Sequence, residues 1–199
     1  MTDQLRIFAG LQGFVSGAGL LALVLFFGLA TPFGAEQRRW AWLGPVNDWF
    51  YVLGAAPWII ASVLLVVRVR GGALLWILTG ALSILVVAGA IVTALMLAGK
   101  VGLNAQFLVA TPMILVGFIW LWPAAAAAVG AAALPGWVLP LSIGILLAFV
   151  VGGAVVGGAF LLPADTAPRM ALFVAGGIPI ALAMIAFPAW WVILASNVR

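Results

Sequence analysis

The residues best placed for chemistry lie close together after the first long apolar stretch. Arg38, Arg39 and Asp48 fall within residues 36–48. A guanidinium pairs well with a phosphate, so these side chains could clamp a lipid headgroup or an anionic substrate. The alternative, which we favour, is that Asn47 and Asp48 cap a following helix while the arginines anchor the segment at the interface. A lipid-processing enzyme that uses Asp48 and Arg39 is therefore the weakest function considered.

Few other residues of this chain could take part in catalysis or bind a metal. The sequence contains neither cysteine nor histidine. Thiolate nucleophiles, iron–sulfur ligation, the usual haem ligands and the commonest general base are excluded by that composition. No serine-hydrolase, zinc-protease, Walker or dinucleotide motif is present. We therefore expect no enzyme, no catalytic residue, no cofactor and no metal.

A second group of candidate residues combines helix-interrupting prolines with their small or polar neighbours. A proline inside a helix frees the carbonyl four residues earlier, so a kink can expose an acceptor deep in a membrane. Such kinks could form a hinge or a neutral-ligand pocket where two helices meet, and ordinary packed kinks are the alternative. The possible hinge or ligand residues are Thr111, Pro112, Gly176, Gly177 and Pro179. The few polar residues that could line the pocket are Thr79, Ser83, Thr93, Gln106 and Thr111.

Small residues at helical spacing form a third group. They let two helix backbones approach closely, as in the GxxxG pattern of membrane helices. They could pack this chain's own helices together or form a seam with another subunit. Residues 137–162 are the better candidate for a seam, because their glycines leave two adjacent sides of one helix without side chains. The helix-packing candidates are Gly13, Gly17, Ala148, Gly152, Gly153 and Gly157.

The elements that carry these residues are predicted by the placement of charge. Stretches of 29 uncharged residues separate Arg6 from Glu36, Arg70 from Lys100 and Arg169 from Arg199. The interval from Asp48 to Arg68 holds 19 uncharged residues, and the interval from Lys100 to Asp165 holds 64. About 20 apolar residues in a helix cross a hydrocarbon core about 30 Å thick. Each shorter interval therefore predicts one membrane span and the longest predicts two.

The composition agrees with a membrane protein. Hydrophobic residues make up 67% of the chain, charged residues make up 6%, and the mean hydropathy is +1.36. We predict an all-α, polytopic six-transmembrane-helix bundle with short loops, in a single domain covering residues 1–199. The predicted spans cover about residues 7–29, 49–67, 73–98, 105–125, 137–162 and 170–196. The Pro135-Gly136 pair places the turn of the longest interval at residues 124–136.

The orientation of the bundle follows less directly from charge. Four basic residues fall at each face, so the positive-inside rule gives a tie. We expect a multi-pass protein of the cell membrane with both termini in the cytoplasm, because Arg6 lies beside the first span. The tryptophans are expected in two interfacial belts, with only Trp58 near the centre of a span. The excess of arginine over lysine, with many alanines, glycines and valines, suggests a bacterial genome rich in GC.

The function that follows is structural. No charged residue falls in the middle of a predicted span, which argues against an ion-coupled pump. The leading hypothesis is a non-catalytic membrane subunit or scaffold, with membrane lipids and either its own copies or other membrane subunits as partners. The alternative is a small permease or binding protein for a neutral or hydrophobic ligand such as a lipid or quinone. Nucleic acid is not expected as a partner, because the basic residues are scattered.

Overall fold

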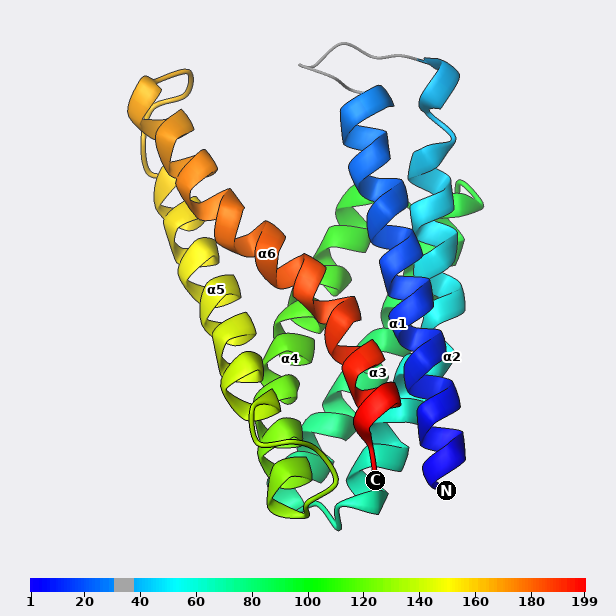
Figure 1. Ribbon diagram of the computed structural model, residues 1–199. Helices are drawn as coiled ribbons and strands as arrows, with labels where there is room; N and C mark the ends of the chain where they lie inside the picture. Colours follow the sequence, from blue (N-terminus) through cyan, green and yellow to red (C-terminus); the bar gives the residue numbers. More distant parts are fainter. Residues whose placement is uncertain (31–37) are drawn as a thin grey trace.

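The computed structural model describes residues 1–30 and 38–199, and these residues form an all-α bundle without strands. Six of the helices in this part of the chain are long and apolar enough to span a membrane, so the chain has the architecture of a multi-pass membrane protein. The predicted fold class is confirmed. The long helices, shown in Figure 1, are α1 (Thr2–Leu25), α2 (Leu43–Arg68), α3 (Ala73–Leu97), α4 (Leu103–Gly130), α5 (Val138–Ala159) and α6 (Ala167–Asn197). A π-helical turn η1 (Phe26–Ala30) extends α1, and a short 3₁₀ turn η3 (Arg38–Trp40) precedes α2.

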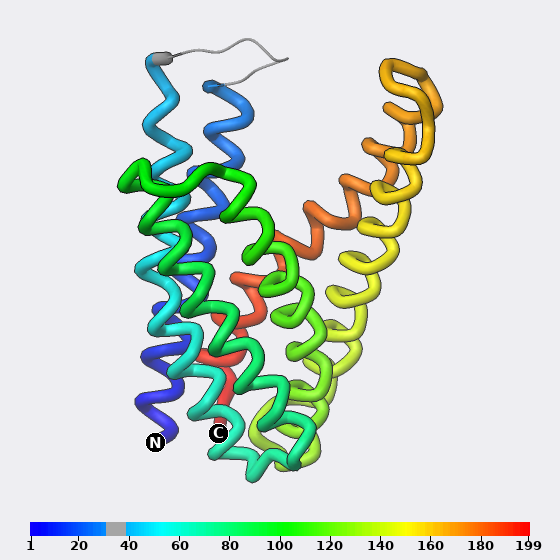
Figure 2. Tube along the Cα trace, turned by 180° about the vertical axis from the view of Figure 1, so that it is seen from behind, coloured from blue at the N-terminus to red at the C-terminus, as the bar shows by residue number. Residues whose placement is uncertain are grey.

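The helices follow one another around a ring. Each long helix packs against the next one in the chain, and α6 returns to pack against α1. Both termini lie at the same end of the bundle (Figure 1), which we call the terminal end. At the opposite end, the α5–α6 hairpin leans away from α1 and α2, and Figure 2 shows the same divergence from behind. The ring is therefore closed at the terminal end and open at the other.

Three helices end with the same backbone motif. After α2, α3 and α4 the chain takes a left-handed residue: Arg70 (φ 51°), Gly99 (φ 68°) and Ala132 (φ 52°). In each case the next amide donates to a carbonyl five residues back, as when Ala133 N donates to Ala128 O over 2.8 Å. This is the Schellman motif, which satisfies the carbonyls that a helix end leaves free. The turns that follow these three helices are therefore fixed by local backbone bonds.

The end of α4 differs from the sequence prediction. The turn was expected at residues 124–136, but α4 continues through Pro123 to Gly130. The alanines that follow Pro123 are strong helix formers, and Ala124, Ala125 and Ala128 are fully buried. Tertiary packing therefore outweighs the helix-breaking effect of this proline.

Several tryptophans also lie in a different environment from the expected interfacial belts. Trp120 on α4 and Trp190 and Trp191 on α6 are 0% exposed. Their rings pack together, with the Trp120 and Trp191 centroids 5.7 Å apart and nearly parallel. Two of the three indole nitrogens are paired: Trp120 Nε1 donates to Thr79 Oγ1, and Trp190 Nε1 donates to Ser142 Oγ, each over 2.8 Å. The buried Trp191 Nε1 has no hydrogen-bond partner among the described residues, so its ring is held by packing alone. These three tryptophans therefore form the aromatic core of the terminal end.

The last residues of the described chain are tied to three elements. Arg6 Nη2 on α1 donates to Val198 O over 2.9 Å, and Arg68 Nη2 at the end of α2 donates to Arg199 O over 2.6 Å. Arg199 N in turn donates to Ala133 O over 3.1 Å. The end of α6 is therefore held against α1, α2 and the turn between α4 and α5.

Candidate functional site

Polar side chains from α2, α3 and α4 meet near the open end of the bundle. Gln106 Nε2 on α4 donates to Asp48 Oδ1 on α2 over 3.2 Å and to Thr93 Oγ1 on α3 over 3.1 Å. Thr93 is fully buried, whereas Asp48 and Gln106 are half-buried. The three side chains link three helices by hydrogen bonds. Such bonds stabilise helix packing in a membrane, where little water competes for the polar groups. Their first evident role is to fix the relative position of these helices.

Asp48 does not have the role that the sequence suggested. Because α2 begins at Leu43, Asn47 and Asp48 lie inside the helix and cannot be its N-cap residues. The Arg39 guanidinium lies 5.2 Å from the centre of the Trp40 ring, while Asp48 accepts from Gln106. The side chain of Arg38 lies outside the described residues. The proposed headgroup clamp therefore gains no support from the contacts of Arg39 and Asp48.

Tyr51 lies one turn further along α2, on the same side as Asp48, and reaches into the same three-helix interface. Its hydroxyl donates to Met113 Sδ over 2.7 Å and lies 3.4 Å from Val86 O. Gly89 on α3 makes room for it, because a Cβ atom at that position would collide with the Tyr51 hydroxyl. Sequence reasoning missed Tyr51. The three-residue spacing from Asp48 is a signal that could have found it.

The Tyr51–Gly89 contact gives a testable prediction. Replacing Gly89 by alanine is expected to lower the free energy of unfolding by about 1 to 2 kcal/mol, because the tyrosine tip must move within a packed interface. Adding Tyr51→Phe removes the colliding oxygen and should recover most of that loss. Thermal unfolding of the single and double variants in mild detergent measures both effects. A double variant whose losses simply add would contradict the contact.

The residues of the predicted hinge are not brought together as a pocket. Thr111 and Pro112 on α4 are exposed, and the Thr111 hydroxyl donates to Phe107 O within its own helix over 2.8 Å. On α6, a Cβ at Gly177 would meet nothing within 4 Å, whereas Gly176 packs tightly against α5. The contacts between α4 and α6 instead come from aromatic rings further along, such as Phe118 with Phe187.

The helix-packing candidates divide into two sets. A Cβ at Gly13 would lie 2.7 Å from Val192 Cγ2, and a Cβ at Gly152 would lie 2.6 Å from Gly176 O. Gly13 therefore holds α1 against α6, and Gly152 holds α5 against α6. Gly17 takes part in the first contact at a looser 3.7 Å from Pro188 Cβ, and Ala148 packs beside the core. Gly153 and Gly157 form the other set, because they are exposed and a Cβ there would meet nothing within 4 Å.

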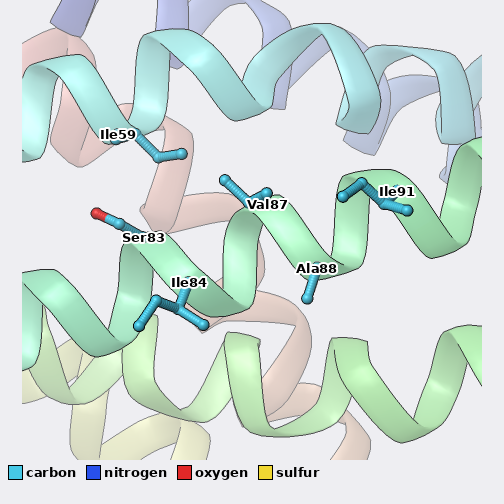
Figure 3. A pocket seen from close by; sticks show the side chains of 6 residues that line it. All are labelled: Ile59, Ser83, Ile84, Val87, Ala88 and Ile91. Carbon is cyan, nitrogen blue, oxygen red and sulfur yellow. The ribbon is translucent and has the colours of Figure 1, made fainter.

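One open hollow lies between α2 and α3 on the outer surface. Its volume is about 440 Å³, and Figure 3 shows its lining residues: Ile59, Ser83, Ile84, Val87, Ala88 and Ile91. Ser83 is the one polar residue among them, and its hydroxyl already donates to Thr79 O over 2.7 Å. The surface of the hollow is therefore apolar in effect, and it suits an aliphatic chain better than a polar ligand.

Comparison with family models, with curated proteins and with solved structures finds no match to this chain. The class of protein is thus defined by the fold alone, as an all-α bundle of membrane-spanning character. The described residues hold no group of three or more acidic, cysteine or histidine side chains close enough to bind a metal ion. Several helical glycines have no neighbour within 4 Å of an added Cβ atom, Gly80 and Gly144 among them, but Gly153 and Gly157 on α5 also have the four-residue spacing of a GxxxG pair.

Proposed function

We propose that this protein is a non-catalytic membrane subunit that assembles with further membrane helices through the outer face of α5. The observation that carries this proposal is the GxxxG pair of Gly153 and Gly157: both glycines are exposed, they lie one turn apart, and an added Cβ atom at either would have no neighbour within 4 Å. A glycine inside a helix costs about 1 kcal/mol relative to alanine. Nothing within the described part of the chain compensates for that cost at these positions. A second helix packed closely against them would do so.

The contrast with the neighbouring glycine strengthens the argument. Gly152 is buried and its backbone touches Gly176 on α6, so its lack of a side chain is explained by the α5–α6 hairpin. Gly153 and Gly157 lie on a different side of the same helix, one turn apart. A GxxxG pair that faces outward is the pattern by which membrane helices of separate chains associate.

The prediction is that the Gly153→Leu and Gly157→Leu double variant loses its assembly. Two leucines would hold the partner helix several ångströms away and remove the close backbone contact. Native mass spectrometry of protein released from its own membrane in mild detergent measures the assembled mass. The matched control is Gly80→Leu with Gly144→Leu, because these glycines are also exposed and also lack neighbours within 4 Å. An assembled mass that is the same in wild type and in both double variants would sink the proposal.

The same measurement addresses the alternative, a carrier or binding protein for a neutral or hydrophobic ligand. The structure gives Pro112 and Pro179 no shared pocket, so these prolines no longer support the carrier. Its support is instead the shallow apolar hollow between α2 and α3. A monomer that retains one small apolar molecule in stoichiometric amount would support the carrier. A complex with defined protein subunits would support the scaffold.

We further propose that the terminal end faces the cytoplasm of the cell membrane. Arg6, Arg68, Arg70 and Arg199 belong to this end, with Asp3 as the acidic residue among them. A reporter that is active only in the cytoplasm, fused after Arg199, tests this orientation. Activity of the same reporter only when it is exported would reverse it.

A further inference from the structure

The contact between α1 and α6 follows a fixed register. A Cβ at Gly10 would lie 3.8 Å from Ala195 Cβ, one at Gly13 would lie 2.7 Å from Val192 Cγ2, and one at Gly17 would lie 3.7 Å from Pro188 Cβ. The two residue numbers add up to 205 in every pair. This constant is expected of two antiparallel helices that pack along stripes with alternating steps of three and four residues.

The two stripes continue along α1 and α6 beyond the last of these pairs, but there the two helices diverge (Figures 1 and 2). The next two pairs in register are Leu20 with Ile185 and Val24 with Ala181. Val24 and Ile185 are each 56% exposed, Ala181 is exposed as well, and Leu20 is half-buried. Figures 1 and 2 show that α6 leans away from α1 over this part of its length. Val192 is also 48% exposed although it packs on Gly13, so it is the divergence of the two helices in Figures 1 and 2, rather than exposure alone, that separates the packed half of this face from the bare half at the open end.

We propose that the bare half of α6 closes onto the bare half of α1 in this register, so that the structure is the open form of a lateral gate. The argument for α1 as the partner is continuity: the face of α6 that is bare at Ile185 and Ala181 is the one that already packs on α1 at Pro188 and Val192. Val24 with Ala181 would bring an aliphatic side chain onto a small one, which favours close helix packing in a membrane, and Leu20 with Ile185 would bring two aliphatic side chains together. The pairing ends at Leu25, because the π-helical turn η1 changes the helical step.

The hairpin has the parts that such a movement needs. Pro188 lies at the last closed pair and has no amide hydrogen to donate to Met184 O, so α6 can bend there without breaking a backbone bond. Gly152 and Gly176 are in backbone contact, which keeps α5 and α6 together as one unit. The pairs that close lie on α1 and α6, whereas Gly153 and Gly157 lie on α5. The gate is therefore argued from other residues than the assembly proposed above.

Disulfide cross-linking in intact membranes tests the closure, and the absence of native cysteine gives a clean background. The test variant is Val24→Cys with Ala181→Cys. The out-of-register control is Val24→Cys with Leu182→Cys, because Leu182 is 60% exposed and lies on another side of α6. The positive control is Gly10→Cys with Ala195→Cys, whose 3.8 Å separation already suits a disulfide.

The test pair is expected to form an intramolecular disulfide at least about tenfold faster than the out-of-register pair, because a disulfide requires the two Cβ atoms within about 4.5 Å. A rate equal to that of the control would overturn the closure and indicate that lipid covers this face. A product of twice the monomer mass would also overturn it, in favour of a second copy at the face. As a second measurement, spin labels at the same two exposed positions should give a short as well as a long distance, and a single long distance would contradict the gate.

Discussion

Replacing Trp120 by alanine is expected to lower the free energy of unfolding by about 3 kcal/mol, the lower end of the range for buried tryptophan in soluble proteins. The lower end applies because helices that separate in a membrane expose their rings to lipid rather than to water. Trp120 is 0% exposed, stacks on Trp191 at 5.7 Å and donates to Thr79 Oγ1 over 2.8 Å. The change removes the ring stacking and the hydrogen bond, and it leaves a cavity where α3, α4 and α6 meet. Unfolding by denaturant in mild detergent measures the loss.

The matched control for this change is Trp122→Ala on the same helix. Trp122 is 50% exposed and lies two residues away, on a different side of α4. Surface substitutions of this kind usually change stability by about 0.5 kcal/mol or less. Equal losses for the two tryptophans would mean that the aromatic core is not where this bundle is held together.

Replacing Gly152 by leucine is expected to separate α5 from α6. A Cβ at this position would lie 2.6 Å from Gly176 O, and backbone atoms cannot move aside as the tip of a side chain can. Overpacking a well-packed contact costs about 1 to 3 kcal/mol, and a clash with backbone belongs at the upper end of that range or above it. We therefore expect a loss of about 3 kcal/mol in the free energy of unfolding, measured in the same way.

Gly144→Leu is the control on the same helix, because a Cβ at Gly144 would meet nothing within 4 Å. This exposed change should be neutral or stabilising by up to about 1 kcal/mol, since leucine is the better helix former. If Gly152→Leu were tolerated as well as Gly144→Leu, the close contact of the α5–α6 hairpin would be refuted. The gate would then lose the rigid unit that it requires.

The candidate sites show how far single residues can be placed from sequence. Gly13 and Gly152 were predicted as packing residues, and both lie in tight contacts with α6. Gly153 and Gly157 carry the same signal, yet they face outward. The spacing of small residues reports that a close approach is possible. It does not report which helix makes the approach.

The polar contacts between helices could not be predicted from the sequence. Gln106 joins Asp48, which is 58 residues away in the sequence, to Thr93, which is 13 residues away, across three helices. The capping role expected for Asp48 was wrong because α2 begins earlier than the apolar pattern indicates. Only the packing of α2, α3 and α4 decides which polar side chains meet.

What the sequence by itself determined is the set of membrane-spanning helices, because the free energy of placing a segment in lipid is a sum over its own residues. Those sums depend on neither neighbours nor topology, so the charged residues mark the rims of the spans. The tertiary structure alone decided which side of each helix faces the interior. In water an apolar stripe reveals that side, but in lipid both sides of a helix are apolar and the stripe disappears. Trp120 and Trp122 are therefore alike in sequence, and packing alone buries one and exposes the other.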